Sequence, residues 1–327
     1  MPAKKKSAKP KGPLVDLDSA AVSPIKFYPF QEEAFLNKER SLWMIMRRQA
    51  GKSFLLGHIG MSWMMEAPNT EVLYVSASLR LGIENIRKEA EVWRKVMEQL
   101  RLAAAMQQDY LIKTAADDDK GNLLDVDAIA DLFEHQKLET KLWHSNTNFS
   151  RSLVVAPNPD TAVGWAANLI LDEVGRMPEF KAVMEAVGPI ISSSPHLRMR
   201  GATTPPPDDA HHSYDLLAPK EDAVFPVNPR GNYYESAGDE PQLVLRADAW
   251  DVAAAGRPMY AMRSVKAITP EESRSASGDK TGWDRNYGCK FVRGGASALP
   301  VLWLNNAQAA GADHGVAIDI TEPMEAA

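Results

Sequence analysis

A short polar turn after an apolar run carries the residues best suited to phosphate chemistry. The turn reads Arg47, Arg48, Gln49, Ala50, Gly51, Lys52 and Ser53, and it follows the apolar run 41–46. Backbone N–H groups and the dipole at a helix start attract anions. We expect Lys52 to reach the β- and γ-phosphates of ATP and Ser53 to ligate Mg²⁺. The same turn also fits a plain solvated helix start, because Met46 replaces the first glycine of the usual pattern.

Two carboxylates end a second apolar run, and their chemistry complements the turn. Asp172 and Glu173 directly follow 168–171. The first acid of such a pair holds Mg²⁺, and the second polarises the attacking water as a general base. Adjacent residues on a strand point to opposite faces, but the chain turns where the strand ends. Both acids are therefore expected to reach the crevice where parallel sheets bind ligands; a surface acidic pair is the alternative.

Two more polar groups stand where nucleotide contacts are expected. Gln31 lies shortly before the first apolar run, and its amide can donate to and accept from the edge of adenine. Thr203 and Thr204 follow the strand expected at 197–201 and precede Pro205. Their hydroxyls are expected to sense the γ-phosphate. A capping glutamine and a polar turn before proline are the alternatives.

The other candidate groups lack partners at suitable spacing. His211 and His212 stand near Asp208 and Asp209 with no further ligand at helical spacing, so a solvated turn is expected there. Cys289 is the single cysteine, which excludes a disulfide framework and a cysteine-based zinc site.

The elements that must position these groups alternate between short apolar runs and helical patterns. Strands are expected at 41–46, 71–77, 152–156, 168–171 and 197–201, and helices from about 29, from 51, over 79–102 and over 178–191. This alternation predicts an α/β domain with a mostly parallel sheet flanked by helices. We expect it to span 25–207.

The flanking segments have a different texture. Residues 1–24 are rich in lysine and proline and are expected to be a disordered tail, either solubilising or weakly phosphate-binding. Residues 208–310 are richer in turn-forming residues, and we expect a smaller, loop-rich linker subdomain with strands near 242–246, 290–292 and 300–304. The net charge of −6 excludes a basic nucleic-acid coat. With no signal peptide and no apolar run of roughly 18 residues, we expect no membrane association and a cytoplasmic location.

In this order, Gln31, the arginine-rich loop, the acidic pair and the Thr203–Thr204 turn resemble the ATPase domain of tailed-phage terminase large subunits. The resemblance covers about 25–210 and implies a RecA-like (ASCE) P-loop NTPase fold. It also implies that Arg48 is an arginine finger acting on the γ-phosphate of the same subunit, with Arg47 as second choice. Residues 157–165 look like the family segment before the acidic strand. Lys52 and Asp172 are 120 residues apart, which is long for the family. The extra residues are expected to form an insertion at about 103–150.

The resemblance further implies a partner set and a missing activity. Members of the family move double-stranded DNA into a procapsid in the host cytoplasm, as a ring on the portal protein with a small terminase subunit. DNA contacts are then expected to be mostly to phosphates. Residues 315–319 resemble the first strand of the family's nuclease, so 311–327 is interpreted as its start. The other metal-binding strands are absent, so no nuclease activity is expected.

Two other functions fit part of the pattern. A helicase of superfamily two places a glutamine, an acidic strand and a threonine turn in the same order, but it needs a second RecA-like domain. A non-hydrolysing nucleotide-binding scaffold needs no acids, so the presence of Lys52, Ser53, Asp172 and Glu173 argues against it.

Overall fold

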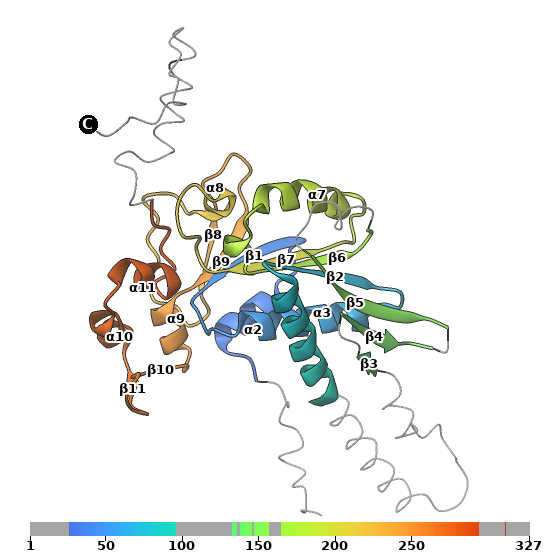
Figure 1. Ribbon diagram of the computed structural model, residues 1–327, viewed down its shortest axis with the longest axis horizontal. Helices are drawn as coiled ribbons and strands as arrows, with labels where there is room; N and C mark the ends of the chain where they lie inside the picture. The colour runs from blue at the N-terminus through green and yellow to red at the C-terminus, as the bar shows by residue number, and fades with distance from the viewer. Residues whose placement is uncertain are drawn as a thin grey trace, which may run out of the picture.

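One continuous sheet organises the part of the chain that the structure describes (Figure 1). The computed structural model describes residues 26–95, 133–135, 138–145, 147–156, 165–293 and 311. The expected tail 1–24 and the segment expected to begin a nuclease lie outside these residues, apart from residue 311. The family-like segment 157–165 is likewise outside them, apart from residue 165.

The sheet has nine strands in the order β3-β4-β5-β2-β6-β7-β1-β9-β8. Their bounds are β1 Ser41–Met46, β2 Glu71–Ser76, β3 Phe133–His135, β4 Glu139–Trp143, β5 Phe149–Val155, β6 Asn168–Asp172, β7 Met199–Thr203, β8 Asn232–Glu235 and β9 Leu243–Ala247. Neighbours from β5 to β9 pair in parallel. β3 and β4 at one edge and β8 at the other run antiparallel. The predicted mostly parallel α/β sheet is confirmed.

The central strands are buried on both faces, which is why they are almost wholly apolar in sequence. β6 is buried along its length, and β1 and β2 are buried at every residue but the first. Continuous apolar runs are typical of parallel strands covered by helices on both sides. β4 and β5, nearer the edge, alternate between buried and half-buried residues. This alternation indicates that only one of their faces meets the core.

Helices cover the two faces of the sheet (Figure 1). The lower layer contains α2 Pro29–Leu36, α3 Lys52–Glu66 and the helical residues 79–95. The upper layer contains η1 Val174–Arg176, α7 Phe180–Ser192 and α8 His212–Leu217. Each layer closes its own apolar core, centred on side chains such as Trp93 below and Phe180 above. Among the described helices, none combines the length and apolar content that crossing a membrane requires.

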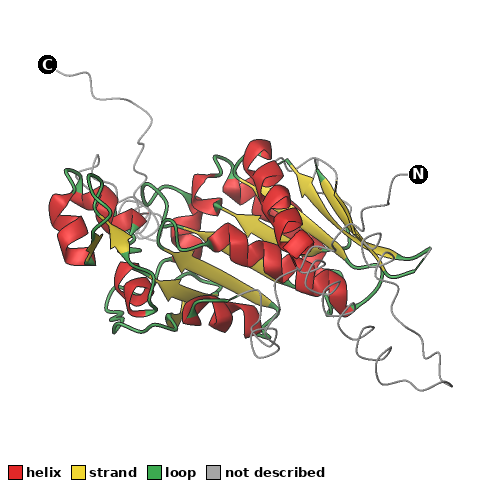
Figure 2. Cartoon of the chain, turned by 90° about the horizontal axis from the view of Figure 1, so that it is seen from below, coloured by secondary structure: helices red, strands yellow, loops and turns green. Residues whose placement is uncertain are grey.

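The region expected as a linker subdomain contributes to the same sheet. β9 pairs in parallel with β1, and β8 pairs with β9 at the outer edge. The remaining elements are α9 Ala249–Ala254, β10 Met259–Tyr260, β11 Ala267–Ile268, α10 Pro270–Ala276 and α11 Lys280–Asn286. They gather beyond β9 at one end of the molecule, as Figures 1 and 2 show.

Several expected element boundaries differ from the structure. The helix expected from residue 178 begins at Phe180, and the strand expected at 197–201 is shifted to Met199–Thr203. Residues 290–293 have no regular structure, so the strand expected at 290–292 is wrong. The strand expected at 300–304 lies outside the described residues. Within 103–150, the structure contains β3 and β4, which sequence patterning did not predict.

Candidate active site

The carboxyl ends of three strands bring the predicted site residues to one edge of the sheet. β7 lies between β1 and β6, and all three run parallel. Parallel strands end at the same edge, which is where open α/β sheets bind ligands. The turn after β1, the acids at the end of β6 and the threonines at the end of β7 therefore converge.

The turn between β1 and α3 is shaped by left-handed backbone. Gln49 has φ 61° and Gly51 has φ 87°. The left-handed backbone at Gly51 favours glycine, and a Cβ added there would come within 2.7 Å of the Gln31 Nε2 atom, so the Gln31 side chain would have to move. The first N–H groups of α3 have no partner within the helix and open onto this turn. The turn can therefore bind an anion although Met46 occupies the position of the usual first glycine.

The Lys52 ammonium lies inside the turn. Its Nζ atom donates to the carbonyl oxygens of Met46 at 3.4 Å and Arg47 at 3.5 Å. It also lies 3.6 Å from Oε1 of Glu173, and the side chain is only 6% exposed. The cation is thus held between the turn and the acid at the end of β6.

Asp172 is buried at the centre of the site and has one carboxylate oxygen to spare. Its Oδ2 atom accepts from Ser53 Oγ at 3.1 Å and from Asn85 Nδ2 at 2.7 Å. Its Oδ1 atom is buried and has no hydrogen-bond partner. Burial and then the Glu173 carboxylate raise the pKa of Asp172, while the Asn85 hydrogen bond opposes that rise. A buried carboxylate with a free oxygen beside a hydroxyl fits Mg²⁺, which prefers oxygen ligands.

Glu173 reaches the same side as Asp172 because its backbone is left-handed. Its φ and ψ are 55° and 42°, a conformation that costs about 1 kcal/mol or more in a residue with a Cβ. Two backbone hydrogen bonds hold it, from Glu173 N–H to Ala202 O at 2.8 Å and from Arg176 N–H to Glu173 O at 3.0 Å. This kink is the physical means by which two adjacent acids both reach the turn after β1, Asp172 at Ser53 and Glu173 at Lys52.

Thr203 connects the end of β7 to the turn that follows the acids. Its Oγ1 atom accepts from the Gly175 N–H at 2.9 Å and donates to the Thr204 carbonyl at 2.8 Å. Thr203 and Thr204 are both buried. The threonine pair thus joins two site segments, and its expected sensing of the γ-phosphate stays a prediction.

Gln31 is used within the protein. Its Nε2 atom donates to the Ala50 carbonyl at 3.0 Å, and its Oε1 atom accepts from the Tyr28 N–H at 3.0 Å. The side chain is 2% exposed. These bonds hold the start of α2 against the turn between β1 and α3. The expected reading of the adenine edge by this amide stays a prediction.

The two adjacent arginines of the turn differ in burial. Arg47 is 3% exposed, and its guanidinium donates to the carbonyls of Arg48 at 3.1 Å and Arg257 at 3.4 Å. Burial and then the Arg257 guanidinium lower the pKa of Arg47. The Arg48 side chain is exposed, while its N–H donates to the Asn286 carbonyl at 2.8 Å. Of the two, Arg48 is the one free to move toward a ligand.

Sequence reasoning missed two residues that touch the site. Asn85, from the helical residues 79–95, bonds Asp172 and also donates to Ser76 Oγ at 3.2 Å. Arg257 donates to the Ala50 carbonyl at 3.4 Å and lies over the Tyr28 ring, 5.4 Å from its centroid. For Asn85, a polar residue on the apolar face of an amphipathic segment was an available signal. No local pattern pointed to Arg257.

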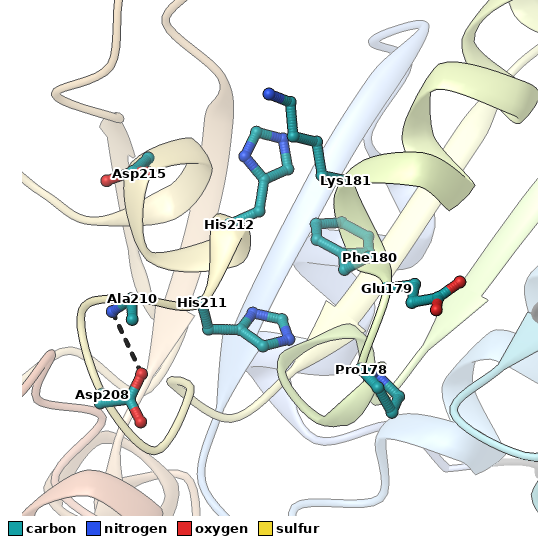
Figure 3. Close-up of a pocket in the computed structure, with 9 residues that line it drawn as sticks. All are labelled: Pro178, Glu179, Phe180, Lys181, Asp208, Ala210, His211, His212 and Asp215. Atoms are coloured by element: carbon teal, nitrogen blue, oxygen red, sulfur yellow. Dashed lines mark hydrogen bonds between the residues drawn. The ribbon is translucent and has the colours of Figure 1, made fainter. Parts of the chain in front are cut away.

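A hollow of about 500 Å³ lies where the segment after the acids meets the segment after the threonines (Figure 3). It is lined by Pro178, Glu179, Phe180, Lys181, Asp208, Ala210, His211, His212 and Asp215. The expectation of a solvated turn here needs correction. His211 is half-buried; its Nδ1 atom accepts from the Ser213 N–H, and its Nε2 atom lies 2.8 Å from the Met177 carbonyl. No cluster of histidine, cysteine or acidic residues in the described ranges is arranged to hold a metal.

Comparisons with known proteins identify the fold. No protein-family model matches the sequence, and no curated protein matches it. The large terminase ATPase domain of Thermus phage P74-26 is 15% identical; the match covers 84% of this chain and 97% of that chain, with a TM-score of 0.52. The large terminase of a thermophilic bacteriophage in complex with ADP is 10% identical, over 81% of this chain and 54% of that chain, with a TM-score of 0.44.

The large terminase of bacteriophage HK97 is 14% identical, over 62% of this chain and 42% of that chain, with a TM-score of 0.40. The likeness to the P74-26 domain shows that this chain has the fold of terminase ATPase domains, a P-loop NTPase fold. The resemblance inferred from the ordered motifs is confirmed at the level of fold.

Proposed function

We propose that this chain is the ATP-hydrolysing motor domain of a phage or prophage terminase, which moves double-stranded DNA into a procapsid. One observation carries the proposal: Ser53 lies 3.1 Å from Asp172 and Lys52 lies 3.6 Å from Glu173, so a cationic turn and two acids meet at one sheet edge. The fold shared with a terminase ATPase domain supports the same function.

The residues that would bind the nucleotide and its metal are those of the turn and of β6. The N–H groups at the start of α3 and the Lys52 ammonium would bind the phosphates of ATP. Ser53 and the free Oδ1 of Asp172 would hold Mg²⁺. When bound, the metal ion supplies charge neutralisation for the phosphate oxygens.

The remaining polar side chains would act on the water and on the developing charge. Glu173, whose side chain is one quarter exposed, would orient the attacking water and accept its proton. Arg48 would neutralise charge on the transferred phosphoryl group, which a planar guanidinium suits. Thr203 bonds the turn that follows Glu173, so it would transmit loss of the γ-phosphate to β7.

The partners belong to the same proposal. Duplex DNA would be the translocated substrate, and a small terminase subunit, the portal protein and further copies in a ring would complete the motor in the host cytoplasm. Each subunit of the ring would contain a complete turn and acidic pair of its own. Gln49 and Ala50 would line the phosphates through their backbone.

The decisive experiment is ATP turnover by Glu173→Gln in the full chain. We expect a loss of roughly 10²–10⁴-fold in kcat with nucleotide affinity retained, because the amide cannot accept the proton of water. Glu179→Gln, an exposed acid a few residues further on, is the matched control and should turn over normally.

Two outcomes would favour the other functions. A wild-type chain that binds ATP without hydrolysing it would be a scaffold, and equal turnover in Glu173→Gln would remove the assigned base. Strand separation without movement along an intact duplex would identify a helicase instead.

A further inference from the structure

A small hairpin at the end of the molecule exposes apolar side chains that nothing in the described chain covers. β10 and β11 pair antiparallel, and the turn between them spans 261–266. Met262 is 104% exposed, Val265 is 95% exposed and Tyr260 is 62% exposed. Several large apolar groups gathered on one projecting turn are typical of a contact surface.

The same hairpin is basic, although the whole chain is acidic. Residues 256–269 contain Arg257, Arg263 and Lys266 and no acidic residue, whereas the full chain has a net charge of −6. Arg263 and Lys266 are exposed and form no ion pair with any acid in the described ranges. Local positive charge of this kind complements a phosphate backbone.

The nearest acids in the sequence are already engaged at the start of α10. Glu271 accepts a hydrogen bond from the indole N–H of Trp250. Glu272 accepts from the Thr269 N–H at 2.9 Å and closes a capping box with it. Glu271 therefore joins α10 to α9 and Glu272 caps α10, and neither forms an ion pair with Arg263 or Lys266.

The turn is ordered by its own hydrogen bonds. Ala261 N–H donates to the Lys266 carbonyl at 3.0 Å, and Ser264 N–H donates to the Ala261 carbonyl at 3.3 Å. Lys266 N–H donates to Ser264 Oγ at 3.3 Å. Because these hydrogen bonds already order the turn, less conformational entropy is lost when it binds a partner.

We propose that the 261–266 turn is a contact surface for duplex DNA. Arg263 and Lys266 bind backbone phosphates, and Met262 and Val265 lie against the sugars at a groove edge. Such contacts read no bases, so binding is independent of sequence. This assignment rests on the proposed translocation function and names the DNA-binding face.

The root of the hairpin connects this surface to the phosphate-binding turn. Arg257, two residues before β10, donates to the Ala50 carbonyl, and its own carbonyl accepts from the Arg47 guanidinium. DNA held at 261–266 therefore acts on the conformation of the turn that binds nucleotide. Coupling between two bound ligands is reciprocal, so nucleotide and DNA change each other's affinity.

The test is the double variant Arg263→Ala, Lys266→Ala in the full chain, with a fluorescein-labelled duplex of random sequence. We expect at least a tenfold loss of DNA affinity at moderate salt. The slope of log affinity against log salt should fall by about 2, because two phosphate contacts are lost. DNA-dependent stimulation of ATP turnover should disappear while basal turnover stays unchanged. Lys38→Ala, Lys220→Ala removes two exposed cations elsewhere and is the charge-matched control.

Unchanged DNA affinity and salt slope in the double variant would overturn the assignment. A second variant, Met262→Ser with Val265→Ser, examines the apolar part and should weaken DNA binding by several-fold. If it instead abolishes self-association while DNA binding is intact, the surface binds a second copy of the chain and the proposal is wrong. A chain that binds DNA through 261–266 but never hydrolyses ATP would contradict the motor function and still support this surface assignment.

Discussion

At the scale of single residues, the neighbouring Arg47 and Arg48 have opposite surroundings. Both belong to the turn after β1, but Arg47 is buried and donates to two carbonyls, whereas the Arg48 side chain is exposed. Arg48→Ala is expected to slow ATP turnover by about 10³-fold, the lower end of what arginine fingers contribute. Single-turnover kinetics with saturating ATP measure this loss.

The matched substitution Arg47→Ala tests whether Arg47 contributes to stability rather than to the rate of ATP turnover. It removes two partly buried hydrogen bonds, so it should lower the free energy of unfolding by roughly 1–3 kcal/mol, as chemical denaturation would report. A full rate in Arg48→Ala with a large loss in a folded Arg47→Ala protein would transfer the finger role to Arg47.

Asn85 illustrates a residue that acts through another. It donates to Asp172 Oδ2 at 2.7 Å, which leaves Oδ1 free. This hydrogen bond opposes the rise that burial causes in the pKa of Asp172. Asn85→Ala is expected to lower activity by about 10–100-fold, the usual cost of losing a partner of a metal ligand. The Mg²⁺ concentration for half-maximal turnover should rise with it, whereas a purely structural defect would lower the rate without moving that midpoint.

At the scale of elements, a buried acid fixes the helical residues 79–95 against β5. Glu89 is fully buried and its Oε1 accepts from Ser152 Oγ at 2.6 Å. Burial raises the pKa of Glu89 from 4.5 to about 7. Between these values the folded chain keeps a proton that the unfolded chain has released, so stability falls as pH rises through this range and levels off above it.

Glu89→Gln should remove this pH dependence. At pH 8 the variant is expected to be more stable than the wild type by up to roughly 3 kcal/mol, and at pH 4.5 the two should be similar. Urea denaturation at both pH values measures the difference. Glu91→Gln, exposed on the same helix, is the control. A parallel pH dependence in wild type and Glu89→Gln would contradict the assignment.

At the scale of the whole molecule, a buried ion cluster joins the end of β9 to the start of α9 and to the segment after α11. Arg246, at the end of β9, donates to Asp248 Oδ2 at 2.7 Å and to the Gly288 carbonyl at 2.8 Å. It also lies 3.7 Å from Asp251, and the Arg246 side chain is 10% exposed. Because β9 pairs with β1, this cluster lies beside the strand that leads into the turn proposed to bind phosphate.

Arg246→Ala would leave two buried carboxylates without their cation. We expect a loss of about 3–5 kcal/mol in the free energy of unfolding. Hydrogen exchange should show that β1 and β9 unfold in a single transition. Arg230→Ala, which removes an exposed pair with Glu33, should cost less than about 1 kcal/mol. Separate transitions for 26–207 and for 208–293 would instead support two independent domains.

The sequence alone predicted the mostly parallel α/β architecture, and it pointed to the residues proposed for the chemistry. Apolar runs such as 41–46 and 168–171 are strands because both faces are buried, and that burial is visible as composition. The roles expected of Lys52 and Asp172 followed from their position at the ends of such runs. Such patterns can be recognised in the sequence because they involve residues that are adjacent in the chain.

Only the tertiary structure decided what depends on distant contacts. The kink that turns Glu173 toward Lys52 relies on a hydrogen bond to Ala202, and the partners Asn85 and Arg257 come from remote segments. The same holds for β9, which joins the main sheet although its run sits in a loop-rich region. Strand pairing and side-chain convergence are set by free energy gained across the whole core, which no window of sequence contains.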